Sequence, residues 1–250
     1  MDDIAVIILA AGKGTRMRSD LAKVLHPVAG QSMVNHVIQC AKGVTREHIH
    51  VVVGHQADRV KAEVLKSHQA RFALQKELLG TGDAVKAALP ELAGNIKDVL
   101  VLCGDVPLIQ RETIQDMVQA HRAANAALSV LAVEVDAPKG YGRIIRDGQG
   151  RLLAIREEAD ASDAEKEIRL VNSGIYCFAR SFLETGIHLI QNQNNQAEYY
   201  LTDLVEIAVS KALKTLVIKA GNPDQVMGVN TLEELARADV LFGKTQNELP

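Results

Sequence analysis

The chain has 250 residues, of which 47% are hydrophobic, 24% charged and 3% aromatic, and its formal net charge is −3. This composition is typical of a folded globular protein and excludes a disordered chain. No basic excess is present to neutralise a nucleic-acid backbone, and the few aromatic residues exclude the stacking surface of a single-strand binder.

The sequence also carries signals of cellular location. No apolar run reaches the roughly 18 residues of a membrane span, and no basic segment of a signal peptide precedes the first strand. The cysteines, Cys40, Cys103 and Cys177, are far apart, which fits buried reduced thiols better than a disulfide framework. We expect a cytoplasmic protein that binds neither membrane nor nucleic acid; nothing in the sequence predicts its oligomeric state.

A buried strand followed by a glycine loop opens the chain. Residues 4–9 are mostly β-branched or aliphatic, which is typical of a strand buried on both faces of a parallel sheet. Gly12 and Gly14 follow, with Lys13 and Arg16, so that backbone N–H groups and positive charge can surround phosphate oxygens. Met17 replaces the third glycine of a dinucleotide fingerprint, and the Walker spacing is absent. The loop predicts a nucleotide phosphate site; an exposed basic turn is the alternative.

Strands and helices then alternate. The sequence predicts helices over 33–42, 57–68, 80–89 and 112–123, and strands over 48–53, 71–75, 98–103 and 127–135. This alternation predicts a Rossmann-like, doubly wound α/β fold with a mainly parallel sheet and helices on both faces. The ligand crevice is then expected at the carboxyl ends of the strands.

The pattern changes after residue 136. A Gly-Tyr-Gly segment at 140–142, a turn at 147–150 and a strand over 151–155 predict a hairpin. Helices over 201–213 and 232–241 and a strand over 215–218 follow. The hairpin indicates an antiparallel addition, so we expect a mixed sheet.

Asp105 is the strongest candidate for chemistry. It follows the buried strand over 98–103 directly and is expected to reach into the crevice, opposite the glycine loop. A carboxylate in that position suits Mg²⁺, whose shell is usually completed by phosphates and water. A turn residue or helix cap is the alternative.

Eight motifs along the chain together resemble the sugar nucleotidyltransferases. They lie at 9–17, 23–26, 75–82, 104–108, 140–144, 172–174, 198–203 and 229–230. The similarity is greatest to the pyrophosphorylase domain of the bacterial N-acetylglucosamine-1-phosphate uridylyltransferases and covers residues 4–242. It implies the nucleotide-diphospho-sugar transferase fold, with UTP and N-acetylglucosamine 1-phosphate as substrates and UDP-N-acetylglucosamine and pyrophosphate as products. Hexapeptide repeats of an acetyltransferase domain are absent from the 250 residues, so we expect residues 1–250 to form a single nucleotidyltransferase domain.

The resemblance implies a role for each of several residues. The nucleotide is expected to contact Leu9, Ala10, Ala11, Gly12, Gly14, Lys23, Gln75, Gly80 and Thr81. The acetamido sugar is expected to contact Gly142, Glu157, Asn172, Glu198, Tyr200 and Thr202. The catalytic residues are expected to be Arg16, Lys23 and Asp105. Asp105 and Asn230 are expected to hold a Mg²⁺ cofactor.

The chain departs from the family pattern at four positions. These are Ala22 for a proline, Leu78 for a second glutamine, Asp83 for a histidine and Ala159 for a lysine. Glu198 and Thr202 have an alternative role at the start of the helix predicted over 201–213. Two other functions stay open: transfer with a different sugar or nucleotide, and a non-catalytic nucleotide-sugar-binding regulatory domain. The complete set of metal and leaving-group residues argues against the regulatory domain.

Overall fold

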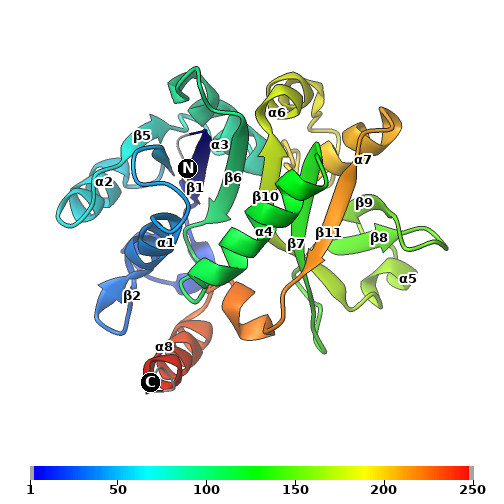
Figure 1. The fold of residues 1–250 in the computed structure, drawn as a ribbon. Helices are drawn as coiled ribbons and strands as arrows, with labels where there is room; N and C mark the ends of the chain where they lie inside the picture. Colours follow the sequence, from blue (N-terminus) through cyan, green and yellow to red (C-terminus); the bar gives the residue numbers. More distant parts are fainter. Residues whose placement is uncertain (1–2, 248–250) are drawn as a thin grey trace.

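A nine-stranded mixed sheet runs through the computed structural model, which describes residues 3–247 (Figure 1). The main path has the order β11-β7-β10-β6-β1-β4-β5, and β8 and β9 extend it beside β10. The strand β1 (Ile4–Ala10) pairs in parallel with β4 (Ile49–Val53) and with β6 (Asp98–Cys103). Beyond β4, the strand β5 (Arg71–Leu74) is also parallel. The predicted α/β fold with a mainly parallel sheet is confirmed.

One long central strand gives the sheet its mixed character. The strand β10 (Leu170–Ala179) is antiparallel to both of its neighbours, β6 and β7 (Leu128–Glu134). Its register against β7 shifts between Asn172 and Tyr176. Because Tyr176 pairs with Val101 and Ala179 with Asp98, the first residues of β10 lie beyond the carboxyl end of β6. The antiparallel direction therefore brings Asn172 to the edge of the sheet where β1 and β6 end.

The predicted hairpin is formed by β8 (Arg143–Arg146) and β9 (Leu152–Arg156). It joins the sheet through a pairing of Arg143 with Val171, near the start of β10. The strand β11 (Thr215–Lys219) is the edge strand at the end of the sheet opposite β5 and is parallel to β7. The hairpin is thus the expected antiparallel addition, attached at the same edge as Asn172.

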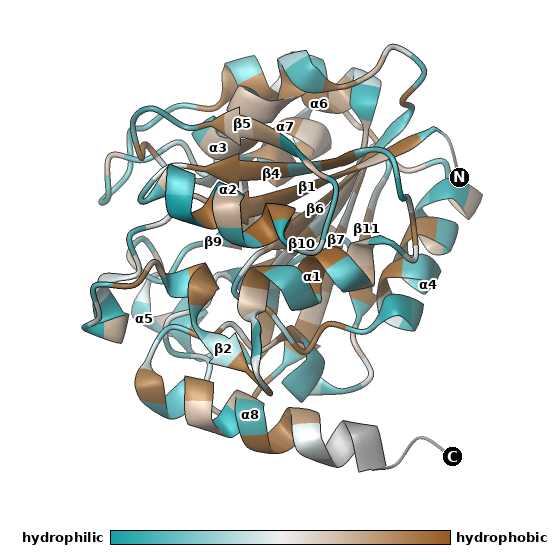
Figure 2. Ribbon diagram, turned by 90° about the vertical axis from the view of Figure 1, so that its left-hand side faces the viewer, coloured by the Kyte–Doolittle hydropathy of each residue, from teal (hydrophilic) through white to brown (hydrophobic). Residues whose placement is uncertain are grey.

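Successive residues of β1 face two different hydrophobic cores, as expected of a strand in a doubly wound sheet. Ile4, Val6 and Ile8 pack with α1 (Met33–Ala41), α2 (Ala57–Leu65) and α4 (Arg111–Ala123). Ala5 and Ile7 pack with α3 (Thr81–Ala88), α6 (Arg180–Gly186) and α7 (Asp203–Ser210). Figure 2 shows the hydrophobic sheet as a layer between these two sets of helices.

The last helix packs beside β2 (Pro27–Val28), which pairs with β3 (Gln31–Ser32) in a small sheet of two strands. A small cluster joins α8 (Leu232–Asn247) to β2 through Val28, Val229 and Ala238. The remaining short elements are α5 (Asp163–Lys166) and the 3₁₀ helices Thr15–Met17, Lys23–Leu25, Leu89–Glu91, Ile187–Leu189 and Pro223–Val226. The cluster places residue 230 beside the ends of β1 and β6.

The predicted helices and strands agree with the structure within three residues, except that α8 extends to Asn247 instead of residue 241. The strand β10, the helix α6 and the short elements β2, β3 and α5 were not predicted from the sequence. The cysteines of the described region are free, with Cys40 and Cys177 buried and Cys103 partly exposed. None of the helices between residues 3 and 247 is long and apolar enough to span a membrane.

A buried histidine makes the stability of the fold depend on pH. His50, in the middle of β4, is 0% exposed, and neither ring nitrogen has a hydrogen-bond partner among the described residues. Burial, followed by the charges of Arg71 and His48, lowers the pKa of His50 from 6.5 to about 4. Between these values the unfolded chain binds a proton that the folded chain excludes, so stability is complete above pH 6.5 and falls as pH decreases.

We expect His50→Leu to remove this part of the pH dependence. Between pH 7 and pH 5 the contribution of His50 to the free energy of unfolding changes by about 2 kcal/mol. Urea unfolding at both pH values measures it, with the exposed His188 substituted by leucine as the matched control. Equal pH slopes for the wild type and His50→Leu would show that His50 is not excluded from protonation by the fold.

Candidate active site

The glycine loop leaves β1 through a turn that only glycine accommodates. Gly14 has a φ of +63°, and a Cβ on it would lie 2.4 Å from the Cβ of Lys23. The loop is anchored by hydrogen bonds from His55 N to Ala11 O at 3.0 Å and from Gly104 N to Leu9 O at 2.9 Å. The absence of a side chain at Gly14 therefore lets Lys23 pack against the loop, at the carboxyl end of β1.

This loop forms one wall of a hollow of about 490 Å³. The structure brings together here all the residues that the sequence analysis expects at the nucleotide: Leu9, Ala10, Ala11, Gly12, Gly14, Lys23, Gln75, Gly80 and Thr81. Asp105 and Glu198 also line the hollow. Glu198, expected at the sugar, thus lies beside the residues expected at the nucleotide.

Gln75 is held rigidly in the wall of this hollow. Its side chain is 5% exposed, and Nε2 donates hydrogen bonds to Gly80 O at 3.0 Å and to Asp83 Oδ2 at 2.9 Å. With both amide hydrogens engaged, Oε1 is left as the acceptor that a ligand can use. Asp83, which replaces a histidine usual in the family, therefore has a function that the sequence analysis missed: it orients Gln75.

The segment after Glu198 closes over the other side of the same hollow. Tyr199 N donates to Leu79 O at 2.7 Å, and Gly82 N donates to Tyr199 O at 2.7 Å. A Cβ on Gly80 would lie 2.7 Å from Tyr199 O, and Gly80 has a φ of +108°. Only glycine at position 80 allows this close approach between α3 and the chain that leads into α7.

Four charged or polar side chains meet at the mouth of the hollow. Lys23 Nζ forms an ion pair with Asp105 Oδ2 and donates a hydrogen bond to Asn230 Oδ1 at 3.0 Å. Arg16 Nη2 donates to the same Asn230 Oδ1 at 2.9 Å. The structure therefore joins all the residues expected for catalysis and for the metal, although they are up to 214 positions apart in the sequence.

Asn230 is positioned by the backbone and by the start of α8. Val229 N donates to Asp105 O at 2.8 Å, which ties the chain before α8 to the loop after β6. Asn230 N donates to Glu234 Oε2 at 2.6 Å, and Glu234 N donates to Thr231 Oγ1 at 3.2 Å. This reciprocal capping arrangement fixes the backbone from which the Asn230 side chain extends.

The donor set fits a divalent cation that is shared with a substrate. Asp105 and Asn230 supply one carboxylate and one amide oxygen, both hard donors, and the ammonium group that they surround shows that the position accepts positive charge. Among the described residues no group of three His, Cys, Asp or Glu side chains could hold a metal ion. An ion here would need phosphate and water oxygens to complete its coordination, as Mg²⁺ in nucleotide sites commonly does.

A second group of polar residues gathers on the hairpin side of the sheet. Thr202 Oγ1 donates to Glu157 Oε1 at 3.1 Å, and a Cβ on Gly142 would lie 3.3 Å from Glu157 Oε2. Asn172 N donates to Gly142 O at 2.8 Å. Thr202 occupies the position before α7 but makes no side-chain cap hydrogen bond there, so its hydroxyl serves Glu157 instead. Gly142, Glu157, Asn172 and Thr202, all expected at the sugar, are therefore neighbours.

The pKa values of two carboxyl groups on the hairpin side, those of Glu157 and Asp203, are raised above their usual values. Burial raises the pKa of Glu157, opposed by the hydrogen bond from Thr202. Beside it, burial and then the charge of Glu206 raise the pKa of Asp203 to about 6. Both carboxylates line a separate hollow of about 320 Å³ together with Tyr200, whose buried hydroxyl has no hydrogen-bond partner among the described residues. Perturbed carboxyl groups of this kind are frequent at functional sites.

Arg143 supports the turn at 140–142 in a way that the sequence analysis did not predict. It is 1% exposed and forms an ion pair with Glu158 at 2.7 Å. Glu158 also accepts a hydrogen bond from Gly140 N at 3.1 Å. The Gly-Tyr-Gly-Arg motif can be recognised in the sequence, but the partner of its arginine, Glu158, follows the second strand of the hairpin and was not predicted.

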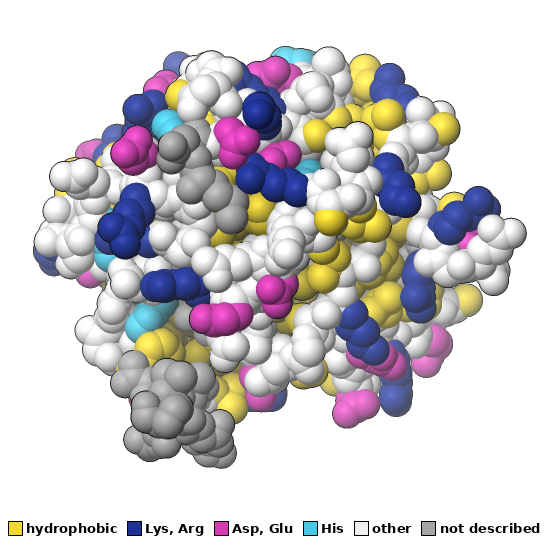
Figure 3. All heavy atoms as spheres, in the orientation of Figure 1, with side chains coloured by type: hydrophobic (Ala, Val, Ile, Leu, Met, Phe, Trp, Pro, Cys, Tyr) yellow, Lys and Arg dark blue, Asp and Glu magenta, His cyan; other side chains and the backbone are white. Residues whose placement is uncertain are grey.

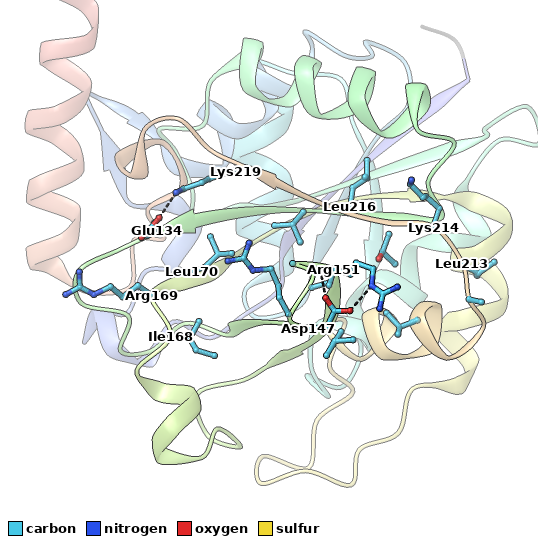
Figure 4. Close-up of a pocket in the computed structure, with 18 residues that line it drawn as sticks. Glu134, Asp147, Arg151, Ile168, Arg169, Leu170, Leu213, Lys214, Leu216 and Lys219 are labelled. Atoms are coloured by element: carbon cyan, nitrogen blue, oxygen red, sulfur yellow. Dashed lines mark hydrogen bonds and ion pairs between the residues drawn. The ribbon is translucent and has the colours of Figure 1, made fainter.

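A larger hollow, of about 1030 Å³, lies between β11 and the β8–β9 hairpin and lacks these features (Figure 4). Its two carboxylates are paired, Glu134 with Lys219 and Asp147 with Arg151. Figure 3 shows hydrophobic side chains gathered beside β11 on this face, with Lys and Arg side chains around them. The loop that carries Gly12 and Gly14 does not line it, so size alone does not identify the active site.

Comparisons with known proteins show what this chain is similar to. The nucleotidyl transferase family matches residues 5–222. The bifunctional protein GlmU of Geobacter metallireducens is 49% identical over 238 residues, which cover 95% of this chain and 50% of that protein. GlmU of Pelobacter propionicus is 46% identical, covering 95% of this chain and 52% of that protein. The chain thus spans about half the length of these relatives.

A solved structure shows the same fold at low sequence similarity. A glucose-1-phosphate thymidylyltransferase, so described, from Bacillus anthracis superposes with a TM-score of 0.73 at 18% identity, covering 95% of this chain and 94% of that one. The glycine loop, the Lys23–Asp105–Asn230 group and the family match point to the same conclusion. The chain belongs to the nucleotidyl transferase family.

Proposed function

We propose that this protein is a Mg²⁺-dependent uridylyltransferase that converts UTP and N-acetylglucosamine 1-phosphate into UDP-N-acetylglucosamine and pyrophosphate. The observation that carries the proposal is the meeting of Arg16, Lys23, Asp105 and Asn230 at the mouth of the glycine-loop hollow. Residues 1–250 would form one catalytic unit. Three free cysteines fit action in the reducing cytoplasm, where both small-molecule substrates would be met.

The proposed reaction needs charge stabilisation more than proton transfer. The attacking group is a phosphate oxygen of the sugar phosphate, which is already anionic, so no general base is required. In this proposal the β- and γ-phosphates leave beside Arg16 and Lys23, whose positive charge would stabilise the departing pyrophosphate. A bound Mg²⁺ would supply further charge neutralisation at the α-phosphate, held by Asp105 and Asn230.

Gln75 supports uridine as the nucleoside. Its Oε1 is the acceptor left over after Nε2 has bonded to Gly80 and Asp83. A uracil ring presents an N3–H donor, whereas the N3 of cytosine is an acceptor, so an aimed carbonyl oxygen favours uracil. Leu78, which replaces the second glutamine usual in these enzymes, lines the same hollow and offers only apolar contact. Thymine carries the same N3–H group, so discrimination against thymidine would depend on other contacts.

The sugar side would be formed by the group around Glu157. Its carboxylate can accept hydrogen bonds from sugar hydroxyls, and the Asn172 side chain supplies an amide suited to an acetamido group. Ala159, where the family often has a lysine, is exposed and only its carbonyl oxygen is engaged, by Asn195 Nδ2 at 2.7 Å. Recognition of the sugar phosphate would then depend more on Lys23 and on the metal.

A panel of substrates tests the proposed function. Pyrophosphate release is measured for UTP, dTTP, CTP, ATP and GTP with N-acetylglucosamine 1-phosphate, glucose 1-phosphate and galactose 1-phosphate. We expect the highest kcat/KM for UTP with N-acetylglucosamine 1-phosphate. A higher kcat/KM for another pair would support the reaction type but contradict the proposed substrates. If no pair released pyrophosphate, the result would favour a nucleotide-sugar-binding regulatory domain.

Asn172→Ala is expected to affect the sugar and leave the nucleotide almost unaffected. Asn172 lies on β10, on the hairpin side, whereas the nucleotide residues come from the first half of the sheet. We expect KM for N-acetylglucosamine 1-phosphate to rise by about tenfold or more, with KM for UTP changed by less than about twofold. The ratio of kcat/KM for N-acetylglucosamine 1-phosphate to kcat/KM for glucose 1-phosphate should decrease. Equal increases in both KM values would contradict a sugar-specific role for Asn172.

A further inference from the structure

One side chain of the protein contacts both residues that would bind the metal. Lys23 Nζ contacts Asp105 Oδ2 and Asn230 Oδ1 at the same time. Asp105 and Asn230 are the two side chains that this chain is proposed to offer to Mg²⁺. The ammonium group therefore lies in the position between them that the ion would have to enter.

Lys23 is built into this position. Its Cβ packs against Gly14, where any side chain would collide with it, and its backbone belongs to the 3₁₀ helix Lys23–Leu25. The side chain of Lys23 is 15% exposed and that of Asp105 is 19% exposed. A pair this sheltered is screened by salt much less than a surface ion pair, so the ammonium is a strong competitor for the carboxylate.

We propose that Lys23 is the resident cation of the Asp105–Asn230 site and keeps divalent ions out of the protein that has no nucleotide bound. This inference rests on the proposed function for its assignment of Asp105 and Asn230 as metal ligands. An ammonium and a divalent ion cannot share the two oxygens, because they repel each other at contact distance. The phosphates of an incoming nucleotide offer Lys23 a new anionic partner, which frees Asp105 for the ion.

The order of binding follows from this exchange. A metal ion that arrives alone must displace Lys23 into water without a new partner, and Arg16, bonded to Asn230 Oδ1, adds a second positive charge beside the site. When a metal ion arrives with a nucleoside triphosphate, the phosphates give Lys23 a new partner and offset the positive charge of Arg16. Metal affinity of the nucleotide-free protein is therefore low because of one identified side chain.

Binding of Mn²⁺ alone, without nucleotide, tests the proposal. Free Mn²⁺ is measured by electron paramagnetic resonance over a titration of the wild type, Lys23→Met and Lys23→Gln. We expect both variants to bind one Mn²⁺ at least about tenfold more tightly than the wild type does. Adding Asp105→Asn to Lys23→Met should abolish the gain, which locates the ion at this site.

Lys13 provides the matched control. It lies in the same loop, lines the same hollow and is exposed, and it has no ion pair with any described residue. Lys13→Met removes one positive charge from the neighbourhood without freeing Asp105, so Mn²⁺ affinity should change by less than about twofold. An equal gain in Lys13→Met and Lys23→Met would overturn the proposal in favour of a general charge effect.

The wild type gives an independent test if the Lys23 variants do not fold. Stoichiometric Mn²⁺ binding by the nucleotide-free wild type at micromolar concentration, lost in Asp105→Asn, would contradict the proposal. Failure of the proposed function is distinguishable from failure of this inference. A wild type that is inactive with UTP and N-acetylglucosamine 1-phosphate, while Mn²⁺ affinity still rises in Lys23→Met, would contradict only the substrate assignment.

Discussion

Replacing Asp105 by asparagine is expected to lower kcat by about 1000-fold, while KM for UTP changes only a few-fold. Among residues 3–247, Asp105 supplies the carboxylate that forms an ion pair with Lys23, and it is one of the two proposed metal ligands. The charge that it helps to neutralise grows as the α-phosphate is transferred, so its loss affects the transition state more than the bound nucleotide. Steady-state pyrophosphate release at saturating Mg²⁺ measures both constants.

The control for this variant is an exposed aspartate that plays no part in the site. Asp58, in the first turn of α2, is exposed, and Asp58→Asn should leave kcat within about twofold of the wild type. Turnover of Asp105→Asn close to that of the wild type would remove Asp105 from both the metal site and the catalytic group.

Arg16→Ala is expected to reduce kcat/KM for pyrophosphate in the reverse reaction by about 100-fold. The guanidinium extends from the glycine loop to Asn230 Oδ1, at the mouth of the hollow. Its planar fork can hold two phosphate oxygens at once, which a lysine ammonium cannot. Arg16→Lys should therefore recover only part of the loss, because it restores the charge without the geometry.

Arg18 is the matched control, because it is an exposed arginine two positions away whose side chain, unlike that of Arg16, makes no hydrogen bond to Asn230. Arg18→Ala should leave KM for pyrophosphate unchanged. The same small effect in Arg16→Ala and Arg18→Ala would show that Arg16 is a solvated turn residue, the alternative that the loop sequence leaves open.

The first half of the fold could be predicted because local pattern and tertiary position agree there. Ile4, Val6 and Ile8 face one core and Ala5 and Ile7 the other, which is what an unbroken apolar run indicates. Strand, turn and helix then repeat at regular spacing, and parallel strands connected in this way end at one edge of the sheet. The nucleotide residues follow these strand ends, so their convergence was predictable.

The strand β10 could not be recognised by the same reasoning. Its first part carries Asn172, Ser173 and Gly174, which are typical of a loop, and its register against β7 shifts there. Gly174 has a φ of +80°, outside the range of a regular strand. The alternation of apolar residues is interrupted where the register shifts, so this part of the strand lacks the usual sequence signal of secondary structure.

Side-chain contacts between segments far apart in the sequence could not be predicted either. The Lys23–Asp105 pair spans 82 positions and the Lys23–Asn230 hydrogen bond 207. The family resemblance implied that these residues serve one site, yet it gave no indication that Lys23 would contact both Asp105 and Asn230. The hydrogen bond by which Asp83 orients Gln75 spans only eight positions, but it too depends on side-chain geometry that the sequence does not show.

A crystal structure of the protein with UDP-N-acetylglucosamine and Mg²⁺ tests the central claim most directly. The account predicts the uracil ring beside Gln75 Oε1, the acetamido group beside Asn172 and Glu157, and the metal on Asp105 and Asn230, with Lys23 moved from Asp105 to a phosphate oxygen. A ligand bound instead in the larger hollow between β11 and the hairpin, or a metal held away from Asp105, would contradict it.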